Sequence, residues 1–283
     1  MVSNINSFLN WSQNQLAGVH SPRLDSEILL AHTLKLSRTQ LRTQFDRVLN
    51  DSEKNLAKKY VQRRRNREPV SQIVGYQEFW SLNFAVDKNV LTPRPETEIL
   101  IETALSCPSH GKILDLGTGS GVLAVVMAKE VPGCEVVALE LDPKALSIAR
   151  ENAKVHGVDD RVEFICGDLI EEDWRGNYSM ILSNPPYIPS ADIQKIMPEV
   201  QNYEPLKALD GGLDGLDFYR DIIPKARNRL EKNGYLILEI GHSQADDIKT
   251  IFQKSSGFKN IQVIQDYSGY DRVIKAKKES SDG

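Results

Sequence analysis

Hydrophobic residues recur at helical spacing through the first part of the chain. One such segment begins near Asn4 and ends at Gly18, and a second opens at Ser21-Pro22, where a proline suits the first turn of a helix. A third begins near Asp51. About three or four short helices bury too little surface to be stable alone. The pattern therefore predicts a small helical bundle over residues 1–75, docked on a larger domain.

The pattern changes after Pro69. Apolar residues partly alternate between Gln77 and Val86, which predicts a short pair of strands. We assign residues 76–90 to a short β linker between two domains. The two prolines of Thr92-Pro93-Arg94-Pro95-Glu96 then stiffen the backbone before a further helix.

Strands and helices alternate from residue 111 onwards. The expected strands are residues 112–116, 135–140, 161–166, 178–183, 235–240, 260–265 and 272–276. The expected helices lie at about 121–130, 143–156, 216–231 and 243–255. Such alternation indicates parallel β-α-β units. We therefore expect residues 91–283 to form an α/β domain, an open sheet that helices cover on both faces.

The composition narrows the class of protein. Hydrophobic residues make up 40% and charged residues 26%, as in soluble globular proteins, and no apolar run approaches the roughly 20 residues of a spanning helix. The N-terminus shows no secretory signal, so a cytoplasmic protein is expected. Cys107, Cys134 and Cys166 form no Cys-x-x-Cys pair, so we expect no metal site and interpret each as a small buried residue.

The charge balance argues weakly against a nucleic-acid substrate. The net charge is −4, whereas proteins that grip many phosphates usually carry a basic excess. One basic stretch, residues 58–67, stands out. It is either a solvated helix face or a docking surface for an acidic or RNA-associated partner.

A glycine-rich turn follows the first expected strand of the second domain. Gly117-Thr118-Gly119-Ser120-Gly121 lets the backbone approach a ligand closely at the start of a helix. No Gly-Lys-Ser/Thr follows, which excludes a P-loop, and Val122 stands where the dinucleotide fingerprint needs glycine or alanine. The spacing resembles motif I of the Rossmann-like methyltransferases, in which these residues bind the methionine part of S-adenosylmethionine. An ordinary strand-helix connection is the structural alternative.

The next two strand ends carry further candidates for donor binding. Glu140 ends a strand about 20 residues after the glycines, where a carboxylate can accept hydrogen bonds from both ribose hydroxyls. Asp168 and Leu169 follow the next strand. In methyltransferases of this type, an acid there receives the adenine amino group and the next side chain lies against the ring. The alternatives are an exposed strand-end acid for Glu140 and a helix N-cap for Asp168.

The strongest motif is Asn184-Pro185-Pro186-Tyr187, directly after the strand 178–183. Two prolines cannot continue a strand ladder, so they lock a rigid loop. The Asn184 side-chain oxygen and the Pro185 carbonyl can each accept one N–H of a planar amine, which turns the nitrogen lone pair toward the donor methyl. The Tyr187 ring can pack on the acceptor and near the sulfonium.

These features predict catalytic roles for Asn184, Pro185 and Tyr187, and acceptor binding by these residues together with Pro186. Asn184 is also expected to line the donor site. No general base is required, because the proton of the methylated nitrogen can leave to water afterwards. A Pro-Pro turn that arose by chance is the structural alternative.

Together these motifs resemble the N5-glutamine methyltransferases of peptide chain release factors. The similarity also covers residues 23–27, 75–80, 93–98, 205–209 and 271–273. The resemblance implies a Rossmann-like seven-stranded methyltransferase sheet with a small N-terminal helical domain that recognises the release factor. It implies S-adenosylmethionine as cofactor, and as acceptor the glutamine of the release factor's Gly-Gly-Gln motif, which acts in translation termination.

Other acceptors remain open. A paralogue methylates a glutamine of a ribosomal protein, and an N6-adenine methyltransferase acting on DNA or RNA could use Asn-Pro-Pro-Tyr equally well. Those adenine enzymes usually carry a separate target-recognition region, and residues 1–75 show no helix-turn-helix signature. The net charge and the long family match favour a protein acceptor, with no membrane and no direct nucleic-acid contact required.

Overall fold

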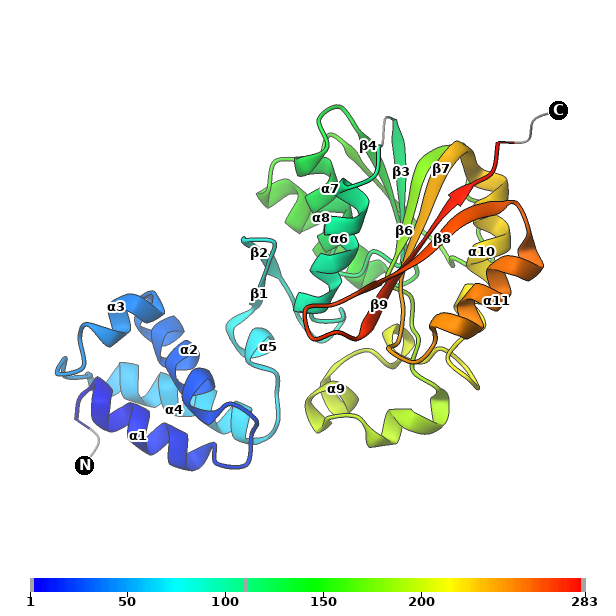
Figure 1. The fold of residues 1–283 in the computed structure, drawn as a ribbon. Helices are drawn as coiled ribbons and strands as arrows, with labels where there is room; N and C mark the ends of the chain where they lie inside the picture. Colours follow the sequence, from blue (N-terminus) through cyan, green and yellow to red (C-terminus); the bar gives the residue numbers. More distant parts are fainter. Residues whose placement is uncertain (1–2, 109–110, 281–283) are drawn as a thin grey trace. The chain divides into compact units, whose positions relative to one another are not determined.

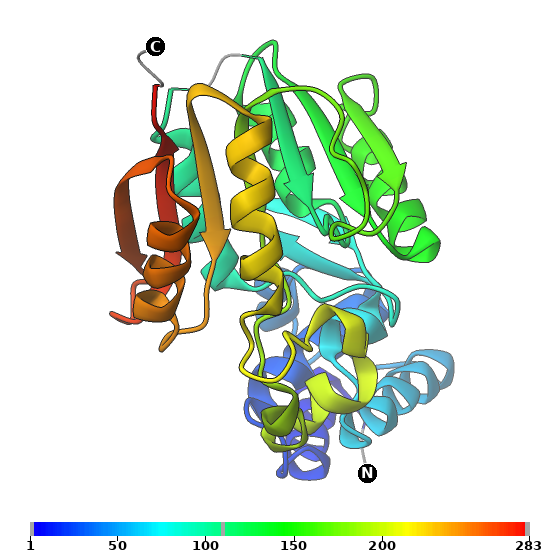
Figure 2. The same ribbon diagram turned by 90° about the vertical axis from the view of Figure 1, so that its right-hand side faces the viewer.

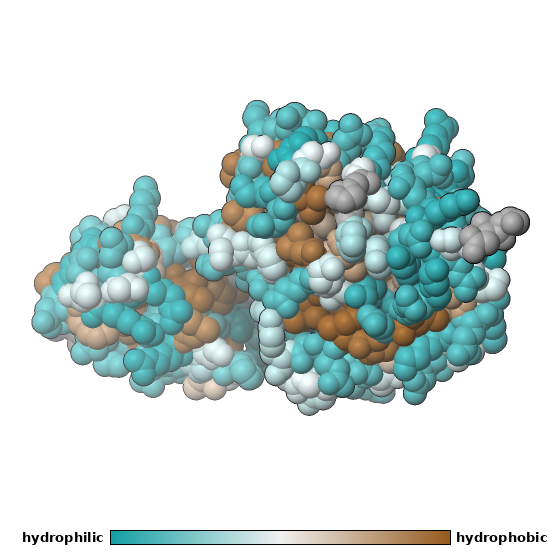
Figure 3. Space-filling view, turned by 45° about the horizontal axis from the view of Figure 1, so that its top comes forward, coloured by the Kyte–Doolittle hydropathy of each residue, from teal (hydrophilic) through white to brown (hydrophobic). Residues whose placement is uncertain are grey.

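The chain forms two compact units, which the computed structural model describes over residues 3–108 and 111–280 (Figure 1). Unit 1 comprises Met1–Tyr76 together with Met197–Tyr203, and unit 2 comprises Gln77–Ile196 together with Glu204–Gly283. Hydrophobic residues of the two units gather in separate core clusters. In the view of Figure 3, hydrophilic residues cover most of the surface and apolar ones show in smaller areas between them.

Unit 1 is helical. Its elements are α1 (Ile5–Gln15), α2 (Pro22–Leu34), α3 (Arg38–Arg42), α4 (Asp51–Arg65), α5 (Val70–Val74) and α9 (Pro198–Tyr203). Capping boxes start α1 at Asn4 and α4 at Asn50, and Pro22 occupies the first turn of α2. The sequence pattern located α1, α2 and α4. It missed α3 and α5, which have 5 residues each and are too short to show a helical period.

A buried arginine ties α9 to the helices of the N-terminal segment. The Arg64 guanidinium donates from Nε to Asp25 Oδ2 at 2.6 Å and from Nη2 to Glu199 Oε1 at 3.1 Å. Arg67 donates to the same Glu199 oxygen at 3.0 Å. A buried charge needs such partners. Residues 197–203 therefore belong to unit 1, although the sequence pattern placed them inside the 91–283 domain.

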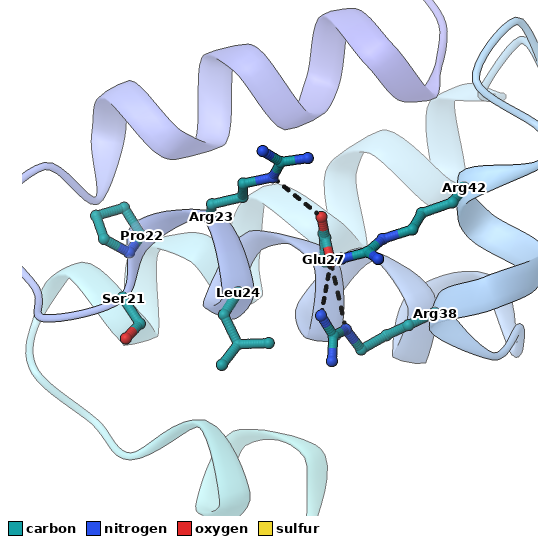
Figure 4. A pocket seen from close by; sticks show the side chains of 7 residues that line it. All are labelled: Ser21, Pro22, Arg23, Leu24, Glu27, Arg38 and Arg42. Carbon is teal, nitrogen blue, oxygen red and sulfur yellow. Dashed lines mark hydrogen bonds and ion pairs between the residues drawn. The ribbon is translucent and has the colours of Figure 1, made fainter.

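Three arginines of unit 1 converge on another buried carboxylate, that of Glu27 (Figure 4). They line a pocket of about 270 Å³. Burial alone would raise the pKa of Glu27, but hydrogen bonds from Arg42, Arg38 and Arg23 lower it below its usual value. Glu27 therefore stays charged and holds α2 and α3 together.

The basic stretch 58–67 is largely engaged inside unit 1. Arg63 pairs with Glu68, and Arg64 and Arg67 share Glu199. These ion pairs argue against a free docking surface at Arg63, Arg64 and Arg67, and the buried Arg64 does not fit the expected solvated helix face either.

Unit 2 is built on a seven-stranded sheet of order β5-β4-β3-β6-β7-β9-β8. Its strands are β3 (Lys112–Leu116), β4 (Glu135–Glu140), β5 (Val162–Cys166), β6 (Tyr178–Ser183), β7 (Leu230–Glu239), β8 (Phe258–Gln265) and β9 (Asp271–Lys278). Its helices are α6 (Glu98–Leu105), α7 (Val122–Glu130), α8 (Pro143–Val155), α10 (Asp217–Arg229) and α11 (Ala245–Ser255). The predicted Rossmann-like α/β fold is confirmed.

Helices cover both faces of this sheet, as predicted. Ile113 and Met180 point to the face covered by α6 and α7, whereas Leu114 and Ile181 point to the face covered by α10 and α11 (Figures 1 and 2). The linker region forms a hairpin of β1 (Tyr76–Phe79) and β2 (Leu82–Ala85).

The expectation of parallel units was wrong for the last strand. β9 is antiparallel to both β7 and β8, because no helix separates β8 from β9 in the sequence. Another expectation was wrong for one cysteine, since Cys107 and Cys134 are buried but Cys166 is exposed. No described helix is long and apolar enough to cross a membrane.

The parallel strands bring their carboxyl ends to one edge of the sheet. Leu116 of β3 is aligned with Leu139 of β4 and with Ser183 of β6, which is aligned in turn with Leu238 of β7. The residue that follows each of these four therefore emerges at the same edge. These residues are Gly117, Glu140, Asn184 and Glu239.

The stability of unit 1 depends on the buried ion pair of Arg64 with Asp25. Arg64→Ala should destabilise this unit by about 3–5 kcal/mol, because the change leaves the buried Asp25 carboxyl without its cation. Urea unfolding followed by circular dichroism measures the loss. Arg65→Ala is the control, since Arg65 is exposed and makes only a 3.4 Å bond to Gln15. Equal shifts of the two variants would contradict the role of Arg64.

Candidate active site

The glycine-rich turn between β3 and α7 has the left-handed backbone that glycine permits. The φ angles are 70° at Gly117, 55° at Gly119 and 85° at Gly121. A Cβ on Gly121 would lie 3.0 Å from the Cβ of Ala149 in α8, so only glycine fits between the turn and that helix. Gly117 is exposed, which leaves the backbone of the turn open to a ligand.

Glu140, the residue predicted to bind the ribose, lies against this turn. Its Oε2 accepts the Gly119 N–H at 2.9 Å, and its Oε1 accepts the Asp142 N–H at 2.9 Å. Each oxygen retains a second lone pair, and the side chain is half-buried. The carboxylate is thus held in a fixed orientation in which it can still accept hydrogen bonds from a diol. These acceptor positions fit the two ribose hydroxyls of S-adenosylmethionine.

Two other side chains of the turn are engaged inside the fold. Thr118 and Ser120 are buried, and the Thr118 hydroxyl donates to Asp115 Oδ2 at 2.5 Å. Burial raises the pKa of Asp115 to about 7. The Thr118 hydroxyl is therefore committed to Asp115, and neither the Thr118 nor the Ser120 side chain is exposed at the turn.

Asp168 and Leu169 follow β5 at the same sheet edge. Asp168 Oδ1 accepts the Ile170 N–H at 2.7 Å, so this oxygen caps a turn. The contact resembles the helix N-cap that was the structural alternative for Asp168. The Leu169 side chain reaches the glycine turn, since a Cβ on Gly117 would lie 3.9 Å from Leu169 Cδ2. Leu169 is thereby placed beside the candidate donor site.

The loop Asn184-Pro185-Pro186-Tyr187 begins directly after β6. Pro185 is buried, Asn184 is half-buried, and the Asn184 Nδ2 group donates to Thr97 Oγ1 at 3.3 Å. The Tyr187 carbonyl accepts the Gln244 Nε2 group at 3.0 Å and lies 2.3 Å from where a Cβ on Gly215 would stand. The loop is therefore fixed by close backbone packing at its end as well as by its prolines.

The Tyr187 hydroxyl points into the protein. It donates to Glu239 Oε1 at 3.4 Å. Burial and the neighbouring Glu239 carboxylate raise the pKa of the Tyr187 phenol, so the hydroxyl remains protonated. Only the ring of Tyr187 is left for packing against an acceptor.

Sequence reasoning missed two residues of this region, Glu239 and Thr97. Glu239 is 1% exposed and its Oε2 accepts the Thr97 hydroxyl at 2.7 Å. Burial raises the pKa of Glu239 to about 7, against the lowering effects of the Thr97 hydrogen bond and of Arg272. A signal was present, because Glu239 lies near the end of an expected apolar strand, as Asp115 and Glu140 do.

The structure thus brings the predicted donor residues and the acceptor loop to one edge of unit 2. A side-chain hydrogen bond links the two segments where they begin: the Ser183 hydroxyl, just before Asn184, donates to the carbonyl of Leu116, just before Gly117, at 2.8 Å. Such an edge is where ligands bind in open α/β sheets.

Two family models match the chain, the Methyltransferase small domain over residues 95–200 and the PrmC N-terminal domain over residues 7–75. A release factor glutamine methyltransferase of Geobacter sulfurreducens is 43% identical over 95% of each chain. Another, of Rhodopirellula baltica, is 37% identical, again over 95% of each chain. The chain belongs to the release factor glutamine methyltransferase family. With this family, methyltransferase activity and the expected donor, S-adenosylmethionine, are confirmed.

A solved structure agrees with the fold of this family member. A methyltransferase from Pyrococcus furiosus superposes with a TM-score of 0.54 at 21% identity, covering 71% of this chain and 91% of the other. At that identity the likeness supports the methyltransferase fold alone.

Glu140→Ala should weaken the binding of S-adenosylmethionine by the methyltransferase roughly 10- to 100-fold. The estimate follows from the loss of hydrogen bonds to a charged group, about 1.5–3 kcal/mol. Calorimetry measures the dissociation constant, and Glu135→Ala, at the exposed start of the same strand, is the control. An unchanged constant would remove Glu140 from the donor site.

Proposed function

We propose that this chain transfers a methyl group from S-adenosylmethionine to the side-chain amide nitrogen of the glutamine in the Gly-Gly-Gln motif of peptide chain release factors. The observation that carries the proposal is the position of Asn184-Pro185. These residues directly follow Ser183, which is aligned with Leu116, the last residue before the donor turn. The choice of acceptor follows from the relatives of Geobacter sulfurreducens and Rhodopirellula baltica, which are named as release factor glutamine methyltransferases.

The chemistry of an amide nitrogen explains the rigid loop. Its lone pair is delocalised into the carbonyl, so the nitrogen is a poor nucleophile. Asn184 Oδ1 and the Pro185 carbonyl each accept one N–H of the glutamine amide, which orients the lone pair and stabilises the positive charge that develops on nitrogen. S-adenosylmethionine, when bound, supplies an electrophilic methyl on a sulfonium. The surplus proton leaves to water after transfer, so no general base is needed.

The donor side follows from the same edge of the sheet. Glu140 accepts the ribose hydroxyls, and the turn from Gly117 to Gly121 passes beside the methionine part. Leu169 packs against the adenine, and the free oxygen of Asp168 receives the adenine amino group. The Tyr187 ring covers the planar acceptor.

Recognition of the release factor falls to the helical region, residues 1–75, which the PrmC N-terminal domain model matches over residues 7–75. We place the linker at 76–90 and the catalytic domain at 91–283. Within that range α9 packs with the helices of unit 1 and is assigned to the recognition region. The net charge of −4 supports a protein acceptor that needs no direct nucleic-acid contact. An acceptor that acts in translation termination places the reaction in the cytoplasm.

Asn184→Ala should lower kcat about 100-fold while the dissociation constant of S-adenosylmethionine changes no more than a few-fold. The variant loses an acceptor that is preorganised for the transition state. Steady-state kinetics and calorimetry on the folded variant separate the two quantities. Asn228→Ala, an exposed asparagine of α10, serves as control. If kcat stays normal, the Asn184 side chain does not bind the acceptor.

The acceptor itself is tested by mass spectrometry. A purified release factor incubated with S-adenosylmethionine and the enzyme should gain one CH₂ unit on the Gly-Gly-Gln glutamine. A release factor with alanine in place of that glutamine should gain nothing, as should DNA and RNA in parallel reactions. Transfer to nucleic acid beside an unmodified release factor would favour the adenine-methylating alternative instead.

A further inference from the structure

The acceptor role proposed for Asn184 depends on which way its amide faces. An asparagine side chain carries an acceptor oxygen and a donor NH₂ group of nearly equal size, so either can occupy a given position. Only the oxygen can receive an N–H of the glutamine amide. With the opposite orientation, two NH₂ groups would face each other and the nitrogen lone pair would not be directed.

The partner of Asn184 is Thr97, in the segment Pro95–Thr97 before α6. A threonine hydroxyl has one hydrogen to donate. The Thr97 hydrogen is directed to Glu239 Oε2, at 2.7 Å, which is much closer than the 3.3 Å to Asn184 Nδ2. Toward Asn184, the Thr97 oxygen can then only accept. It therefore selects the NH₂ group of Asn184 and leaves Oδ1 for the acceptor.

Glu239 also holds the other end of the acceptor loop. Its second oxygen accepts the Tyr187 hydroxyl, and its backbone carbonyl accepts the hydroxyl of Tyr219 at 2.8 Å. One buried carboxylate thus contacts Tyr187 directly and reaches Asn184 through Thr97. Burying such a carboxylate is costly unless it is paired, and the described residues that donate to it are Thr97 and Tyr187, through their hydroxyls.

We propose that Glu239 and Thr97 are positioning residues for methyl transfer, which set the Asn184 amide with its oxygen toward the acceptor. The inference rests on the acceptor role proposed above for Asn184. Neither residue has to touch the acceptor: the carboxylate orients the Thr97 hydroxyl, and the hydroxyl orients the amide.

The first test compares two substitutions of Thr97 in the full-length enzyme, in alkaline buffer where Glu239 is ionised. Thr97→Val keeps the shape but removes the hydroxyl, and should lower kcat about 10- to 100-fold with donor affinity and KM for the release factor within about 3-fold. Thr97→Ser keeps the hydroxyl and should retain kcat within about 3-fold. Equal kcat values for the valine and serine variants would overturn the proposal.

A double-mutant cycle distinguishes positioning from a general structural role. If Thr97 acts through Asn184, Thr97→Val should have almost no further effect on kcat in an enzyme that already carries Asn184→Ala. Independent losses that multiply would contradict the proposed relay. The wild-type enzyme, run beside the variants, keeps the two proposals separate, because only its failure to methylate the release factor would refute the proposed function.

Glu239→Gln provides a second test if the valine variant fails to fold. Glutamine has the same shape, but its NH₂ group can donate to Thr97 and so release the hydroxyl hydrogen toward Asn184. We expect kcat to fall about 3- to 10-fold with donor affinity unchanged. A kcat equal to that of the wild type would refute the role of Glu239.

Discussion

Parallel alignment of four neighbouring strands is the constraint on which the rest of unit 2 depends. Because β4, β3, β6 and β7 run in one direction, the residues that follow them emerge at one edge, and each supplies a different function there. Gly117 begins the donor turn, and Glu140 accepts a hydrogen bond from it. Asn184 begins the acceptor loop, and Glu239 accepts the hydroxyl of Tyr187 at the end of that loop. The prolines stiffen the acceptor loop and the glycines permit the left-handed backbone of the donor turn, in an arrangement that the strand register sets.

The buried carboxyl groups at this edge lower the free energy of unfolding when they are ionised. Burial raises the pKa of Glu239 from 4.5, and that of Asp115 from 3.8, to about 7. In both cases the folded state binds the proton more tightly than the unfolded state does. Their contribution to stability is therefore lost as the pH rises from about 4 toward 7. Apolar residues would not have this cost, which points to a role in function.

Local patterns were enough to locate the strands, and with them the strand ends at which the candidate donor residues and the acceptor loop lie. The bounds of β3, β4 and β6 were predicted to the residue, since each is a short apolar run ended by turn residues. The failures concern contacts between distant segments. Thr97 and Glu239 are 142 residues apart, and the ion pair of Glu199 with Arg64 spans 135. No periodicity encodes such pairs, although the strand-end position of Glu239 was visible.

The position of α9 has a consequence for the order in which the protein folds as it is made. The helices of the N-terminal segment leave the ribosome first, and Arg64 then has only Asp25 as its carboxylate partner. Glu199 follows 135 residues later, a delay of roughly 7 to 27 s at bacterial rates of synthesis. The N-terminal unit therefore reaches its final packing only after β3 to β6 have been translated. The two segments of unit 1 thus lie on either side of β3 to β6 in the sequence, so its native contacts cannot be completed before those strands are made.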